Sequence, residues 1–136
     1  MFRLKNKNLC RVRTITTFIA LNKAKESWKK EIQKASNLCS DLSAELTKNN
    51  YAVQSVRIVT NPFGEYLNTE SLESARKDLY DLGSLLSVLE STGVRVRFAI
   101  GEARTKEEIA LLPELVKEFG DLCNVCVNVK KDDFGV

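Results

Sequence analysis

Residues 53–67 read V-Q-S-V-R-I-V-T-N-P-F-G-E-Y-L, and this stretch decides the fold. It begins as a run of β-branched residues, which favour β-strands, and the run is interrupted at Pro62. Proline cannot donate a hydrogen bond to a sheet and holds the residue before it extended, so the strand must end at Asn61. The sequence therefore predicts a strand over residues 51–60, followed by a polar turn that contains Glu65.

Segments with strand and helix periodicity alternate on both sides of this stretch. Further strands are predicted at residues 9–21, 94–101 and 122–129, and long helices at residues 23–48 and 70–91. A third helix precedes the last strand, which gives the order β-α-β-α-β-α-β. Such alternation is typical of a parallel sheet with right-handed crossovers. The sequence thus predicts an α/β fold with a four-stranded parallel sheet.

The two long helices each present one apolar stripe. The stripes consist of Trp28, Ile32, Ala35, Cys39, Leu42 and Leu46 in the first helix, and of Leu72, Ala75, Leu79, Leu82, Leu86 and Leu89 in the second. Asn49 and Asn50 are expected to end the first helix, because asparagine tolerates the left-handed conformation. Asn68 or Thr69 is expected to cap the second helix, and Gly93 to end it.

The third helix is predicted to open at Thr105, which forms a capping box with Glu108. Pro113 lies inside its pattern, so we expect a kink there or two short helices that meet at Leu112. We expect a single domain over residues 1–136, structured from residue 9 to residue 129 and followed by a polar tail at 130–136.

A repeated Val-Arg pair divides the predicted sheet into two faces. Aligning the pairs at residues 12, 56 and 96 places on one face Val12, Thr14, Thr16, Phe18, Val56, Ile58, Thr60, Val96, Phe98 and Ile100. The other face then holds Arg13, Ile15, Thr17, Arg57, Val59, Asn61, Arg97, Ala99 and Gly101.

Burial cost predicts which of these faces the helices cover. An unpaired arginine beneath a leucine-rich helix would be very costly, so the helices should cover the Val/Ile/Phe face and leave the arginine face uncovered. A sheet with helices on one face only is usually curled into a barrel or rests on another chain. We therefore expect the equivalent of the start of a β/α barrel, an incomplete one.

The composition excludes several classes of function. The 136 residues are 43% hydrophobic and 29% charged, with a net charge of only +3, so nucleic-acid binding is not expected. No apolar run is long enough to span a membrane or to act as a signal peptide, which favours the cytoplasm and no membrane partner. The chain has no histidine, and this excludes Ser-His and Cys-His nucleophiles and His-ligated metals within it.

The four cysteines, Cys10, Cys39, Cys123 and Cys126, could form two disulfides or one zinc site. Cys123 and Cys126 have the C-x-x-C spacing, but they fall in a predicted strand, where residues three apart point to opposite faces. Cys39 lies on the apolar stripe of a helix. We therefore favour reduced, mostly buried thiols, and we expect no metal site.

Three segments carry a family resemblance. They are V-R-T-I-T-T-F-I at residues 12–19, V-Q-S-V-R-I-V-T-N-P-F at residues 53–63 and I-G-E-A at residues 100–103. In sequence and spacing they resemble the opening segments of uncharacterised protein family 0210, also called domain of unknown function 711. The resemblance extends from about residue 9 over the rest of the chain.

The resemblance implies a fold similar to the β/α barrel of pyruvate formate-lyase-like glycyl radical enzymes, with no established activity. It also implies members roughly three times this length, so that the chain corresponds to their N-terminal part. No residue matches a radical glycine or its partner cysteine, and the resemblance therefore implies no radical chemistry here.

The carboxyl ends of parallel strands are where α/β proteins bind ligands. Here those ends supply Thr17, Asn61 and Gly101 to orient a polar ligand, with Glu65 and Glu102 as candidate catalytic carboxylates. Thr16, Thr60 and Asn128 lie at the same ends. The simpler alternative is that the Thr and Asn residues only close the strands and the two glutamates are solvated turn residues.

Three arginines, Arg13, Arg57 and Arg97, could converge on an anion such as phosphate or a carboxylate. Alternatively, they pair with acids elsewhere in a complete barrel or face solvent.

Two functions remain open from the sequence. The chain is a member or a piece of an uncharacterised family that binds a small polar or anionic ligand at the strand carboxyl ends. Alternatively, it is a non-catalytic interaction protein whose uncovered sheet face docks on a second copy of itself or on a longer paralogue. The sequence identifies no cofactor and does not decide whether the protein is an enzyme.

Overall fold

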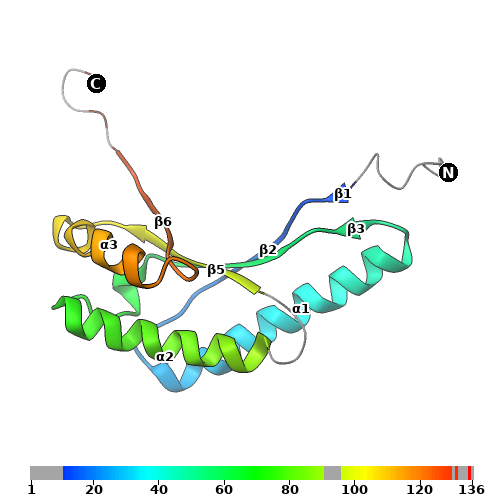
Figure 1. Cartoon of the computed structure of the whole chain (residues 1–136), viewed down its shortest axis with the longest axis horizontal. Coiled ribbons are helices and arrows are strands. Elements are labelled where there is room, and N and C mark those ends of the chain that lie inside the picture. Colours follow the sequence, from blue (N-terminus) through cyan, green and yellow to red (C-terminus); the bar gives the residue numbers. More distant parts are fainter. Residues whose placement is uncertain (1–10, 91–95, 130, 132–134, 136) are drawn as a thin grey trace.

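The computed structural model describes residues 11–90, 96–129, 131 and 135 (Figure 1). Its elements are β1 (Arg11–Val12), β2 (Ile15–Ile19), η1 (Lys25–Ser27), α1 (Trp28–Lys48), β3 (Ala52–Val53), β4 (Val56–Thr60), η2 (Phe63–Glu65), α2 (Leu72–Glu90), β5 (Val96–Ala103), α3 (Lys106–Glu118) and β6 (Asn124–Val127). None of the described helices is both long and apolar enough to cross a membrane.

The main sheet has four parallel strands in the order β2-β4-β5-β6, and β1 pairs with β3 in a short parallel sheet of its own. The predicted α/β class with a four-stranded parallel sheet is thus confirmed. The first and second predicted strands are each split in two. At the split, the hydroxyl groups of Thr14 and Ser55 lie 2.6 Å apart, and Ser55 donates to the carbonyl oxygen of Arg13 at 2.9 Å. Such side-chain hydrogen bonds compete with the strand ladder.

The helices cover the predicted face of β4 and β5. The side chains of Val56, Ile58, Phe98 and Ile100 are buried, whereas Arg97 is exposed on the other face. These four buried strand residues belong to one hydrophobic core with residues of all three α-helices. The helical members are Trp28, Ile32, Ala35, Cys39, Ala75, Leu79, Leu82, Leu86 and Leu115. In Figure 1, α1 and α2 lie on the same side of the strands. We call the opposite side of β2, β4 and β5, on which none of the described helices packs, the open face.

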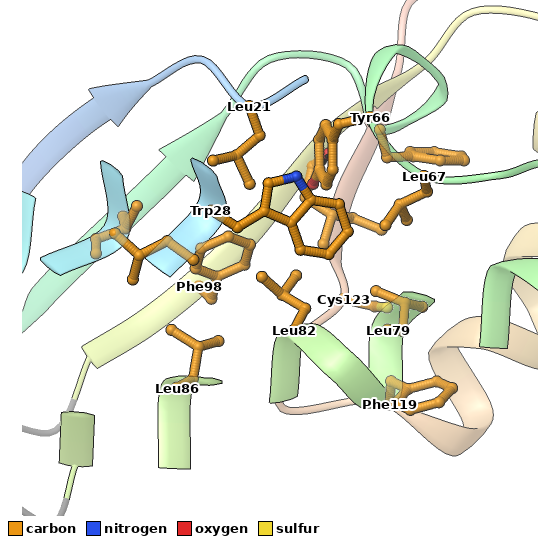
Figure 2. Packing of buried hydrophobic residues seen from close by; sticks show 14 of the residues in the cluster. Leu21, Trp28, Tyr66, Leu67, Leu79, Leu82, Leu86, Phe98, Phe119 and Cys123 are labelled. Atoms are coloured by element: carbon orange, nitrogen blue, oxygen red, sulfur yellow. Dashed lines mark hydrogen bonds between the residues drawn. The ribbon is translucent and has the colours of Figure 1, made fainter. Parts of the chain in front are cut away.

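Trp28 lies at the centre of the core (Figure 2). Its indole N–H donates to the carbonyl oxygen of Asn22 at 2.7 Å, and its ring meets that of Tyr66 edge to face at 5.8 Å between centroids. The Tyr66 hydroxyl in turn donates to the carbonyl oxygen of Ile100 at 3.1 Å and lies 2.8 Å from the hydroxyl of Thr60. Both large aromatic residues therefore have hydrogen-bonded polar ends, which lets them be buried without an unpaired donor.

The face prediction for the first strand is wrong. Ile15 pairs with Val56 across the ladder, so the strand is shifted by three positions from the alignment of the Val-Arg pairs. As a result Ile15 is buried beneath the helices, and Phe18, predicted to be covered, is 77% exposed on the open face. Thr17 also faces the helices, with its hydroxyl 2.9 Å from the sulfur of Cys39 on α1.

Two predicted helix ends differ from those observed. The second helix is capped by Ser71, whose hydroxyl accepts a hydrogen bond from the N–H of Ser74 at 3.1 Å. Asn68 instead accepts from the N–H of Glu70 at 3.0 Å and forms the turn before the helix. The end of the first helix is confirmed, since Asn50 has a φ of 65°. Gly93 lies outside the described residues.

The third helix is continuous from Lys106 to Glu118, so the alternative of two short helices is wrong. Pro113 has no N–H to donate to the carbonyl of Ile109, and both residues are exposed, so water can satisfy that carbonyl. The capping box of Thr105 and Glu108 is confirmed. Leu42 of α1, predicted to be in the apolar stripe, is 45% exposed. The buried residues of α1 all lie between Trp28 and Cys39, so the C-terminal third of the helix packs less closely on the core.

Candidate functional site

A hollow of about 520 Å³ lies on the open face at the amino-terminal half of the strands. Its lining residues are Arg13, Thr14, Gln54, Ser55, Arg57 and Arg97. The three predicted arginines, which lie far apart in the sequence, therefore surround one cavity. We call it the arginine hollow.

The sheet register fixes two of these arginines side by side. Arg57 and Arg97 are direct partners on β4 and β5, and Thr16 is the partner of Arg57 on β2. Neighbouring strands lie about 4.8 Å apart, and like charges directly opposite each other destabilise a sheet. An anion that lies against the two guanidinium groups would relieve the repulsion between them.

The three guanidinium groups have no acidic partner among the described residues. The observed ion pairs involve Lys25, Lys48, Arg76 and Arg104 instead. The Nε atom of Arg57 is buried and has no hydrogen-bond partner in the described part of the chain. An unpaired donor on a charged group is costly to bury, so this atom is the strongest local indication of a missing partner.

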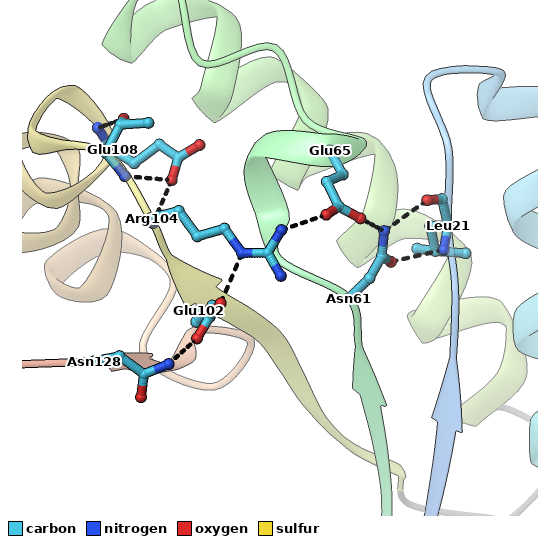
Figure 3. Close-up of polar contacts among 8 residues, drawn as sticks. Leu21, Asn61, Glu65, Glu102, Arg104, Glu108 and Asn128 are labelled. Carbon is cyan, nitrogen blue, oxygen red and sulfur yellow. Dashed lines mark hydrogen bonds and ion pairs between the residues drawn. The ribbon is translucent and has the colours of Figure 1, made fainter. Parts of the chain in front are cut away.

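A second polar cluster lies at the carboxyl ends of the strands (Figure 3). Arg104 donates to Glu102 at 2.7 Å through Nε and to Glu65 at 2.8 Å through Nη1. Asn128 donates to the other oxygen of Glu102. The hydrogen bond to Glu102 is the main contribution that raises the pKa of Arg104, partly opposed by desolvation. Both predicted catalytic carboxylates are thus held by a guanidinium group that stays charged.

Asn61 joins this carboxyl-end cluster to β2. Its side-chain oxygen accepts from the N–H of Leu21 at 2.8 Å, and its amide donates to the carbonyl oxygen of Leu21 at 3.0 Å and to Glu65 at 2.7 Å. Gly101 packs beneath it with a φ of 85°, which L-residues with side chains rarely adopt. Asn61 and Gly101 therefore lie at the carboxyl ends of the strands, and the side-chain amide of Asn61 is already hydrogen-bonded within the fold.

The predicted ligand-binding residues do not form a single site. Arg13 and Arg57 line the arginine hollow, whereas Asn61 and Gly101 lie at the opposite, carboxyl ends of the strands. Thr17 faces α1 and belongs to neither cluster. The arginines and the carboxyl-end residues therefore belong to two separate clusters at opposite ends of the strands.

Sequence reasoning missed Arg104 and the packing around Glu108. The carboxylate of Glu108 accepts from the N–H groups of Arg104 and Thr105 at 2.6 Å and 3.1 Å, and a Cβ on Gly64 would lie 1.8 Å from it. Gly64 therefore allows the turn after β4 to approach the start of α3 closely. The capping box indicated the position of Glu108, but no pattern in the sequence indicates what the side chain of Arg104 reaches.

Among the described residues, no group of three or more His, Cys, Asp and Glu side chains is placed to hold a metal ion. Cys39 and Cys123 are buried and Cys126 is exposed, all three as free thiols, and Cys10 lies outside the described part. Burial raises the pKa of Cys123 from 9.0 to about 11.

We expect the two cysteines of the C-x-x-C motif to differ sharply in reactivity. Near neutral pH, Cys123 forms about a hundredth of the thiolate of an ordinary thiol because its pKa is about 11, and burial also shields it. In a Cys10→Ser protein, iodoacetamide should therefore modify Cys126 long before Cys123 or Cys39, as followed by peptide mass mapping. Equal labelling rates in the folded protein would contradict this, and labelling in urea, where the difference should vanish, is the control.

Comparison with known proteins identifies a family but no characterised relative. The model of the family described as "Uncharacterised ACR (DUF711)" matches residues 3–136, nearly the whole chain. No curated protein and no solved structure gives a significant match. The match agrees with the resemblance of the three segments noted in the sequence, and the chain therefore belongs to the DUF711 family.

Proposed function

We propose that this chain binds a small anionic ligand in the arginine hollow, through Arg13, Arg57 and Arg97. The observation that carries the proposal is the buried Nε of Arg57, which has no partner among the described residues and lies in a cluster of unpaired guanidinium groups. A phosphate or carboxylate group accepts hydrogen bonds from guanidinium forks and would neutralise the repulsion between Arg57 and Arg97.

The carboxyl ends of the strands are the weaker candidate for this ligand. Glu65 and Glu102 bring negative charge there, and Arg104 and Asn128 already occupy their oxygens. A ligand at that end would have to replace hydrogen bonds that the protein makes by itself, whereas a ligand in the arginine hollow would make bonds that are missing. Proton transfer by either glutamate stays a prediction without support from this geometry.

We expect Arg57→Gln to weaken anion binding about 10- to 100-fold, since a hydrogen bond to a charged group contributes about 1.5–3 kcal/mol. The measurement is titration calorimetry of the 136-residue chain with pyrophosphate and with citrate at low ionic strength. Glutamine keeps a polar but shorter side chain and removes the charge and the guanidinium fork.

Two matched variants separate the site from general electrostatics. Lys34→Gln on the exposed side of α1 removes the same charge and should leave both affinities within about twofold. Arg104→Gln removes an arginine at the carboxyl ends and should also have little effect. If Arg104→Gln weakens binding and Arg57→Gln does not, the ligand binds at the carboxyl ends and the arginine hollow is not its site.

The second candidate function is that of a non-catalytic interaction protein. It is favoured by the exposed Phe18 on the open face and by β2 and β6, the end strands of the sheet, whose outer edges pair with no other strand among the described residues. A longer paralogue with acidic residues fits the arginines, whereas a second copy would bring like charges together across the open face. Light scattering that shows a stable dimer at high salt only would support self-association, and a monomer under all conditions would count against it.

We further propose that the chain corresponds to the N-terminal part of a β/α barrel similar to those of pyruvate formate-lyase-like enzymes. The helices on one face and the uncovered arginine face support this, since further strands would enclose the open face as a barrel interior. An in-frame coding sequence after Val136 that continues the β/α alternation would support the proposal, and a stop codon there would oppose it.

A further inference from the structure

A row of apolar residues lies next to the arginines on the open face. Phe18, Val59 and Ala99 are partners across β2, β4 and β5, one row beyond the row formed by Thr16, Arg57 and Arg97. The two rows share a face because they are two residues apart along each strand.

Phe18 is the most exposed member of this apolar row, at 77%, although it lies within strand β2. An exposed apolar residue alone is normal on a protein surface. Here, however, Val59 and Ala99 continue the apolar surface across the next two strands. Phe18, Val59 and Ala99 therefore form an apolar strip beside the arginine hollow, with Phe18 at its β2 end.

The spacing between the two rows matches a small ligand. Two residues along a strand cover about 7 Å, and diagonal neighbours on adjacent strands lie within reach of aromatic and long side chains. Phe18 is the diagonal neighbour of Arg57, because its direct partner is Val59. An anionic group held by Arg57 and Arg97 would therefore place a directly attached ring or branched chain over Phe18 and Val59.

We infer that the ligand of the arginine hollow carries an aromatic or branched apolar group joined closely to its phosphate, phosphonate or carboxylate group. This inference rests on the proposed function, because the arginines must hold the anionic end. Phe18 then determines specificity: it selects anions with an apolar substituent over equally charged anions without one.

The test compares ligands with the same anionic group and different substituents. Phenylphosphonate and methylphosphonate form one pair, and benzoate and acetate form a second pair that tells phosphonate from carboxylate recognition. We expect the phenyl compound of the recognised pair to bind about 3- to 10-fold more tightly, the gain of one aromatic contact, by calorimetry on the full chain.

Phe18→Ser should abolish that preference and leave the affinity for methylphosphonate or acetate unchanged. The matched control is Leu38→Ser, which removes an exposed apolar side chain from α1, and it should keep the preference. Because Phe18 is largely exposed, the variant is expected to fold, and circular dichroism of each variant checks this.

The possible outcomes distinguish the role of Phe18 from the proposed anion binding in the arginine hollow. If none of the four compounds binds the wild-type chain, the proposed anion site itself is wrong. Equal binding of both members of a pair leaves the anion site in place and overturns the role of Phe18. A phenyl preference that survives in Phe18→Ser also overturns it.

Discussion

Replacing Gly101 by alanine is expected to destabilise the protein by about 3 kcal/mol or more, because two penalties add at this position. The residue has a φ of 85°, where any side chain is strained. The new Cβ would also lie 2.3 Å from the carbonyl oxygen of Asn61 and 2.7 Å from its carbonyl carbon. These are backbone atoms, and moving them would pull β4 away from β5.

The measurement is urea unfolding followed by far-UV circular dichroism. Gly83→Ala is the matched control, since Gly83 lies within α2 and its new Cβ would meet only the end of the Leu122 side chain, at 3.2 Å. Alanine favours a helix by up to about 1 kcal/mol over glycine, so this variant should lose little stability or gain some. Equal losses in the two variants would show that strain at Gly101 is not the cause.

Trp28→Ala is expected to cost about 3–5 kcal/mol, the range for removing a large buried aromatic residue. The indole is fully buried and contacts Tyr66 edge to face at 5.8 Å. Truncation would leave a cavity between α1 and the sheet and would remove the partner of the Asn22 carbonyl. Since a domain of this size is stable by only about 5–15 kcal/mol, this loss is a large fraction of its free energy of unfolding.

Trp28→Phe distinguishes the contribution of apolar packing from that of the indole hydrogen bond. Phenylalanine keeps most of the apolar volume and loses the indole N–H, so a loss of about half that of Trp28→Ala is expected. Because Trp28 is the single tryptophan of the chain, the comparison must use circular dichroism and not tryptophan fluorescence. A cost for Trp28→Phe as large as that for Trp28→Ala would place the stabilisation in the hydrogen bond and not in the packing.

The faces of β4 and β5 could be predicted from the sequence because their pattern leaves one solution. Val56, Ile58, Phe98 and Ile100 alternate with arginine and small residues, and a shift by one residue would bury Arg57 beneath the helices. The cost of that burial fixes the alternation, and the structure follows it.

The first strand could not be assigned in the same way. Its residues 14–17 read T-I-T-T, and threonine tolerates either face, so hydrophobicity does not choose between two registers. The repeated Val-Arg pair favoured the wrong one. The ladder with β4 places Ile15 against Val56, and Phe18 on the open face follows from that. The apolar strip beside the arginines was therefore invisible in the sequence.

The candidate site was predictable in its residues and not in its grouping. Arg57 and Arg97 come together because the ladder between β4 and β5 aligns their two Val-Arg pairs, as the repeat predicted. The bonds of Arg104 depend on how a long, exposed side chain is oriented after the strand ends, and no local pattern encodes this. The carboxyl-end residues were predicted to bind a ligand because the sequence does not indicate the hydrogen bonds that they make within the protein.

The side-chain amide of Asn61 extends the pairing between β2 and β4 past the end of β2. Like a backbone peptide, it accepts one hydrogen bond from the N–H of Leu21 and donates one to its carbonyl oxygen. Asparagine side chains deamidate when the backbone nitrogen of the following residue attacks the side-chain amide carbon. This reaction requires that the attacking nitrogen carry a hydrogen. Pro62 has none. The proline that ends the strand therefore also protects this amide from deamidation, so the link between β2 and β4 should outlast the chemical lifetime of an ordinary surface asparagine.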